Sequence, residues 1–103
     1  MNIFMPMSTI LIFGAGKSAT FLIDYLADSC AGGDRQLLVA DLDPTLAASK
    51  LQGRRNTQAV AVKLDEQDFR RQLIGRADVV ISMLPAGLHP IVAADCLELG
   101  KHF

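Results

Sequence analysis

Residues 9–19 read Thr-Ile-Leu-Ile-Phe-Gly-Ala-Gly-Lys-Ser-Ala, and this stretch decides the fold. Four apolar residues lead directly into two glycines separated by one residue, and a helical pattern follows. The order is typical of the strand, tight turn and helix that open a dinucleotide-binding βαβ unit, in its G-x-G-x-x-A form. The alternative is the same turn in a doubly wound fold that binds another ligand or none.

Apolar runs and helical patterns alternate along the rest of the chain. Strands buried on both faces are expected at residues 10–13, 36–41, 59–62 and 77–82, with a fifth beginning at 101–103. Helices are expected between consecutive strands, so the pattern predicts an α/β fold with a doubly wound parallel sheet in the order 3-2-1-4-5. The ligand crevice should then lie at the carboxyl ends of strands 1 and 4, lined by residues 14–19 and 83–87.

Local signals refine the expected helices. Asp43 before Pro44 is typical of a helix start, and Asp65 is expected to cap the helix that follows the third strand. Phe69 and Leu73 are expected on the inner face of that helix.

Each small residue of the glycine-rich turn has an expected role. Gly14 permits the tight turn, Gly16 lets the backbone approach a pyrophosphate, and Ala19 lets the helix pack closely on the strand. Gly16-Lys17-Ser18 also matches the end of a P-loop, but Leu11 stands where that motif needs its first glycine. Lys17 either lies near the phosphates or is a solvated lysine of the first helical turn.

Asp41 ends the second strand, where an acid can accept hydrogen bonds from both ribose hydroxyls and repel the extra phosphate of NADP. The sequence therefore favours NAD over NADP, with a simple turn-forming role for Asp41 as the alternative. Leu42 is placed to contact the adenine. Leu64 and Asp65, after the third strand, are placed to flank its edge, although Asp65 could serve only as a helix cap. His89 is a further candidate for chemistry, or only a residue at the start of a helix.

Composition excludes several function classes. The 103 residues carry a net charge of −1, and Arg54-Arg55 and Arg70-Arg71, the basic pairs, are expected to be solvated, which argues against nucleic-acid binding. No apolar run is long enough to span a membrane. Two isolated cysteines fit buried thiols in a reducing, cytoplasmic location, and no ligand cluster has metal-binding spacing. Residues 1–8 are expected to form a short leader.

Longer motifs resemble the saccharopine dehydrogenase family. The resemblance is carried by residues 10–16 (ILIFGAG), 22–26 (LIDYL), 77–85 (ADVVISMLP), 89–93 (HPIVA) and 100–102 (GKH). It extends from Thr9 to the end of the chain and corresponds to the Rossmann-type, N-terminal NAD(P)-binding domain of that family. It implies an oxidoreductase of lysine metabolism that transfers a hydride between the cofactor and the secondary amine or imine of an amino acid.

The resemblance also implies positions for the cofactor. It places the pyrophosphate among Gly14, Ala15, Gly16, Lys17 and Ser18, the adenosine beside Asp41 and Leu42, and the nicotinamide half beside Met83, Leu84 and Pro85. No catalytic residue can be named, because the family's acid–base groups lie largely in a substrate domain.

On this interpretation residues 1–103 are a truncated cofactor domain, without the substrate domain and inactive alone. An unpaired sheet edge then favours a homo-oligomer. The alternative is a complete NAD(H)-sensing module that regulates a transporter or another partner.

Overall fold

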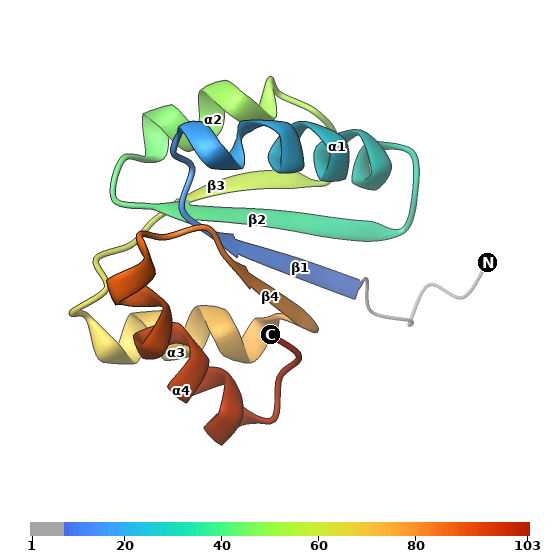
Figure 1. The fold of residues 1–103 in the computed structure, drawn as a ribbon. Coiled ribbons are helices and arrows are strands. Elements are labelled where there is room, and N and C mark those ends of the chain that lie inside the picture. Colours follow the sequence, from blue (N-terminus) through green and yellow to red (C-terminus); the bar gives the residue numbers. More distant parts are fainter. Residues whose placement is uncertain (1–7) are drawn as a thin grey trace.

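The computed structural model describes residues 8–103, and a parallel four-stranded sheet forms its centre (Figure 1). The strands are β1 (Ser8–Phe13), β2 (Arg35–Asp41), β3 (Thr57–Ala61) and β4 (Val79–Ser82). They lie in the order β3-β2-β1-β4, and every neighbouring pair is parallel. This confirms the predicted α/β class and the predicted order of the first four strands.

The ends of the expected pattern differ in detail. His102 forms one parallel bridge to Val79, and the amide of Val80 donates to the His102 carbonyl over 2.9 Å. Residues 101–103 therefore lie beside β4, on the predicted side, but form this isolated bridge and not a fifth strand. Ser8 was expected in the leader but is the first residue of β1; the rest of the predicted leader, residues 1–7, lies outside the described residues.

Helices cover both faces of the sheet (Figure 1). Helices α1 (Thr20–Ala31) and α2 (Pro44–Leu51) lie on one face, and α3 (Gln67–Arg76) and α4 (His89–Leu99) lie on the other. Two short 3-10 turns, η1 (Lys17–Ala19) and η2 (Ala86–Leu88), precede α1 and α4. None of the helices within residues 8–103 combines the length and the apolar composition needed to cross a membrane.

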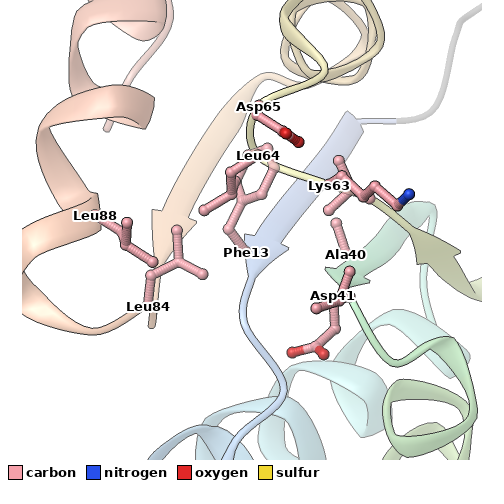
Figure 2. A pocket seen from close by; sticks show the side chains of 10 residues that line it. Phe13, Ala40, Asp41, Lys63, Leu64, Asp65, Leu84 and Leu88 are labelled. Atoms are coloured by element: carbon pink, nitrogen blue, oxygen red, sulfur yellow. The ribbon is translucent and has the colours of Figure 1, made fainter.

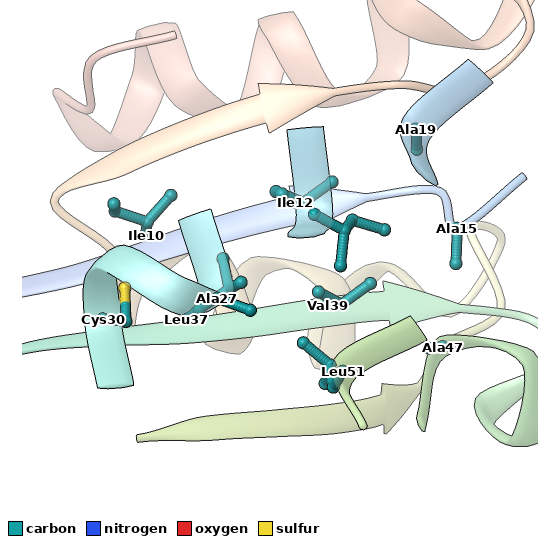
Figure 3. Close-up of a cluster of buried hydrophobic side chains, with 11 residues drawn as sticks. Ile10, Ile12, Ala15, Ala19, Ala27, Cys30, Leu37, Val39, Ala47 and Leu51 are labelled. Atoms are coloured by element: carbon teal, nitrogen blue, oxygen red, sulfur yellow. The ribbon is translucent and has the colours of Figure 1, made fainter. Parts of the chain in front are cut away.

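Strand β1 serves two separate cores, because successive side chains of a strand point to opposite faces. Ile10 and Ile12 pack in the cluster below α1 and α2 (Figure 3), whereas Leu11 and Phe13 pack in the cluster toward α3 and α4. Each core also holds one free, buried cysteine, Cys30 in the first and Cys96 in the second, as the sequence predicts.

The helix caps are only partly as expected. The Asp43 side chain accepts from the amide of Leu46 over 3.1 Å, which confirms it as the N-cap of α2. Asp65 is not a cap, because α3 begins one residue later than an Asp65 cap requires and Glu66 occupies the N-cap without a side-chain bond. Asp65 contributes only its backbone carbonyl, which accepts from the amide of Gln67 over 3.1 Å.

The inner face of α3 was predicted correctly at Leu73 but incorrectly at Phe69. Phe69 is exposed, and the buried positions are Arg70, Leu73 and Ile74. Arg54 was likewise expected to be solvated, but its guanidinium binds Asp24 over 2.8 Å and Asp28 over 2.9 Å. These ion pairs join α1 to the segment after α2, and the bond to Asp28 is the main cause of a raised pKa of Arg54.

Candidate functional site

The turn after β1 lies between β2 and β4, and its first glycine is required there. Gly14 has a φ of +101°, and a Cβ at this position would lie 2.9 Å from the Met83 carbonyl oxygen. The Gly14 amide donates to the Ala40 carbonyl over 2.8 Å, and the Met83 amide donates to the Phe13 carbonyl over 2.7 Å. The structure thus brings the two predicted halves of the crevice together and confirms that Gly14 permits the tight turn.

The second glycine opens the turn to solvent. A Cβ on Gly16 would meet no atom within 4 Å, and its φ of −67° suits any residue. The backbone at Gly16 is therefore unstrained, and the residue has no side chain that could block access to the turn. Lys17 and Ser18 follow it at the exposed beginning of η1, whereas Ala19 is fully buried below. Amide N–H groups at the beginning of a helical segment have no partner within the helix, so the turn presents free donors that suit a pyrophosphate.

Two side chains from α2 and the end of β2 hold this turn. One carboxylate oxygen of Asp41 accepts from the Ala15 amide over 2.7 Å, and the other accepts from the Asp43 amide over 2.8 Å. On the opposite side, the Lys50 ammonium donates to the Gly16 carbonyl and to the Thr20 hydroxyl, each over 2.7 Å. The Asp41 carboxylate is therefore fixed in place, with unused lone pairs for further donors.

A cavity of about 570 Å³ lies at the carboxyl ends of the strands. Figure 2 shows Phe13 at the end of β1, Leu64 from the loop after β3, and Leu84 and Leu88 from the segment after β4 around this space. The lining is mainly apolar, with charged groups at its edge. The complete lining is Phe13, Ala40, Asp41, Leu42, Val62, Lys63, Leu64, Asp65, Leu84 and Leu88. An apolar cavity with a few fixed polar groups suits a ring system attached to a polar sugar.

The predicted site residues fall into three positions. Asp41, Leu42, Asp65 and Leu84 line the cavity. The glycine-rich turn, residues 14–18, lies beside it, held by the Asp41 carboxylate. The other two predicted residues lie outside the lining: Met83 packs against the core below α1 and α2, and Pro85 is exposed.

Sequence reasoning missed several residues of the site. Leu64, which was expected beside the adenine together with Asp65, also lines the cavity. Phe13, Ala40, Val62, Lys63 and Leu88 line it without having been predicted as site residues. Phe13 could have been found, since it is the last residue of β1, where the strand ends and the crevice begins. The role of Lys50 could not be predicted from the sequence, because its contact with the Gly16 carbonyl joins residues that are 34 positions apart.

His89 lies away from the cavity. Its Nδ1 atom is 2.5 Å from the Ser82 hydroxyl oxygen, and the two residues border a separate hollow of about 390 Å³ beside β4. Within residues 8–103, no group of three His, Cys, Asp or Glu side chains is placed to hold a metal ion.

The family model that matches this chain is described as the saccharopine dehydrogenase NADP binding domain, and it matches residues 10–103. Two curated relatives are alpha-aminoadipic semialdehyde synthases. The protein of Arabidopsis thaliana is 30% identical over 112 residues, and the mitochondrial protein of Mus musculus is 31% identical over 100 residues. Each alignment covers 92% of this chain but 10% of the relative, so the chain spans about a tenth of their length.

One solved structure has the same fold. It is the apo form of histidine-tagged saccharopine dehydrogenase (L-Glu forming) from Saccharomyces cerevisiae, with a TM-score of 0.73 and 22% identity. The match covers 91% of this chain and 20% of that one.

Proposed function

The chain belongs to the saccharopine dehydrogenase NADP-binding domain family, and from this premise we propose that it binds NAD as the cofactor domain of an oxidoreductase. The observation that carries the proposal is the position of Asp41. Its carboxylate stands between the glycine-rich turn and the apolar cavity, held on both oxygens by backbone amides. A dinucleotide that extends from the cavity across the turn would pass this carboxylate at the level of its ribose.

The other residues of the site fit the remaining parts of a dinucleotide. The amides of the exposed residues Lys17 and Ser18 bind the pyrophosphate, and Gly16 lets it approach because the space that a Cβ would face holds no atom within 4 Å. Leu42 and Leu64 enclose the adenine in the cavity. Leu84, which lines the same cavity, lies on the side of the nicotinamide half.

The preference for NAD rests on charge. The 2′-phosphate of NADP would approach a carboxylate that cannot turn aside without breaking its bonds to the amides of Ala15 and Asp43. Two negative groups at such short distance repel each other, whereas the ribose hydroxyls of NAD can donate to the free lone pairs. We therefore propose NAD for this chain although the family is described by NADP binding.

We further propose that the substrate is an amino acid carrying a secondary amine or imine, bound by residues outside this domain. The chemistry that the nicotinamide supplies when bound is hydride exchange with the carbon attached to that nitrogen. The support is the similarity to aminoadipic semialdehyde synthases and the membership of the saccharopine dehydrogenase domain family. This domain alone should bind the cofactor without turning it over.

Calorimetry with NADH and NADPH tests the proposal. We expect NADH to bind with a dissociation constant between about 10 μM and 1 mM, a range in which each tenfold step is about 1.4 kcal/mol, and NADPH to bind at least about tenfold more weakly. Asp41→Asn removes the charge but keeps one acceptor, and should reduce the preference for NADH to less than about threefold.

Asp43→Ala is the matched control. It removes a neighbouring carboxylate that caps α2, so it should lower stability by about 1 kcal/mol and leave the cofactor preference unchanged. Absence of NADH binding at millimolar concentration, or tighter binding of NADPH to the unmodified protein, would contradict the proposal.

A further inference from the structure

A buried ion pair joins the two helices on the face opposite α1 and α2. Arg70 of α3 and Asp95 of α4 keep only 10% and 5% of their side chains exposed. The Arg70 Nε donates to one carboxylate oxygen, and its Nη2 donates to the other over 3.4 Å. Arg71 donates to that second oxygen over 3.1 Å and to Glu98 over 2.8 Å. The two arginines therefore both link α3 to α4.

Only Arg70 also reaches the cofactor cavity. Its Nη1 donates to the backbone carbonyl of Leu64. Leu64 lies in the loop between β3 and α3, where it lines the cavity of about 570 Å³ together with Lys63 and Asp65 (Figure 2). A continuous path of hydrogen bonds thus runs from the Asp95 carboxylate through one guanidinium to the wall of the cavity.

Stability of the helix pair alone does not require this arrangement. Removing two charges from water costs most of what their attraction returns, and well-packed apolar side chains often replace a buried ion pair without loss. Arg71 with Glu98 and Asp95 already joins α3 to α4 at the surface. A pair of apolar residues in place of Arg70 and Asp95 could not, however, donate a hydrogen bond to the Leu64 carbonyl.

We propose that Arg70, oriented by Asp95, is a positioning residue for the adenosine part of the dinucleotide site. It fixes the Lys63–Asp65 wall in the shape that receives the ring, so binding does not have to order this loop. The fork of the guanidinium suits the task, because two of its nitrogens engage the carboxylate while a third holds the carbonyl. The proposal rests on the proposed binding of NAD.

The test uses Arg70→Met, Arg71→Met and the double variant Arg70→Met with Asp95→Met. Arg70→Met leaves the Asp95 carboxylate buried with one partner fewer and can fail to fold. The double variant removes both buried charged groups and still leaves the Leu64 carbonyl without its donor. Binding of NADH and ADP-ribose is measured by calorimetry for each folded variant.

We expect the double variant to bind ADP-ribose and NADH about tenfold more weakly than the unmodified protein, and Arg71→Met to bind both as the unmodified protein does. Unchanged affinity in the double variant, or an equal loss in Arg71→Met, would overturn the positioning role.

Amide hydrogen exchange separates positioning from a general loss of stability. The amides of Glu66 and Gln67 donate to the carbonyls of Lys63 and Asp65, so they report the loop. In the double variant these amides should exchange faster while that of Leu11 in β1 stays protected. Faster exchange at all three would overturn the proposal, since the variant would then act on the whole fold. If the unmodified protein binds neither ligand, the proposed function fails, and the exchange experiment alone decides whether Arg70 holds the loop.

Discussion

Replacing Gly14 by alanine should destabilise the fold, and the structure gives the size of the effect. The new Cβ would lie 2.9 Å from the Met83 carbonyl oxygen, 3.0 Å from its carbon and 3.2 Å from the Leu84 nitrogen. All three are backbone atoms of the segment after β4, so no side chain can turn away. Overpacking of this kind costs about 1–3 kcal/mol, and a φ of +101° adds about 1–2 kcal/mol of backbone strain.

The sum of about 2–5 kcal/mol is a large part of the stability of a small domain. At about 4–8 °C per kcal/mol, the melting temperature of Gly14→Ala should fall by about 8 °C or more. Thermal unfolding followed by circular dichroism measures this shift, and urea unfolding gives the free energy directly.

Gly16→Ala is the matched control, with the opposite expectation for stability. A Cβ there meets no atom within 4 Å and the φ of −67° suits alanine, so stability should stay equal or rise by about 0.4–1 kcal/mol. NADH affinity should nevertheless fall, because the methyl group stands where the pyrophosphate approaches. A Gly14→Ala protein as stable as the unmodified one would refute the packing argument.

Two further outcomes concern buried or paired groups. Burial raises the pKa of the Cys30 and Cys96 thiols. The stability gained by keeping them neutral is therefore complete below about pH 9 and is lost as the pH rises above it. Both thiols should resist a disulfide reagent at pH 8 in the folded protein and react with it on unfolding. Arg54→Met should lower the free energy of unfolding by about 1–2 kcal/mol, because it removes bonds to Asp24, Asp28 and the carbonyls of Lys50 and Leu51, whereas Arg55→Met should change it by less than about 0.5 kcal/mol in the same urea titration.

The strands and their order were predictable because they depend on local pattern and a few topological rules. Buried parallel strands are unbroken apolar runs, such as residues 10–13, and right-handed crossovers leave few possible orders. The bounds of β3 were predicted less well. This strand lies at the edge of the sheet, and it begins at Thr57, two residues before the apolar run 59–62.

The inner face of α3 was not predictable from hydrophobicity. Leu73 lies inward as predicted, but the observed face also includes Arg70 and Ile74, which lie one residue, or about 100°, beyond Phe69 and Leu73 respectively. Arg70 can occupy an inward position only because Asp95 meets it from α4, 25 residues along the chain. A pattern within one helix carries no information about a partner on another.

The candidate site divides in the same way. Gly14, Gly16 and Asp41 could be named because their roles follow from backbone geometry at the end of a strand. The contacts that hold them could not, because Asp41 meets the Ala15 amide and Lys50 meets the Gly16 carbonyl only after the sheet and α2 have formed. That the named residues contact the cofactor stays a prediction.

The division of β1 between two cores also constrains how its gene can change. Substitutions among Ile, Leu and Val at residues 10–12 alter volume by little and should be tolerated. Insertion or deletion of a single codon there would instead shift each following side chain of β1 to the opposite face of the sheet and move the glycine turn away from β4. Homologous chains should therefore differ in which apolar residues form this strand but not in the length of the strand.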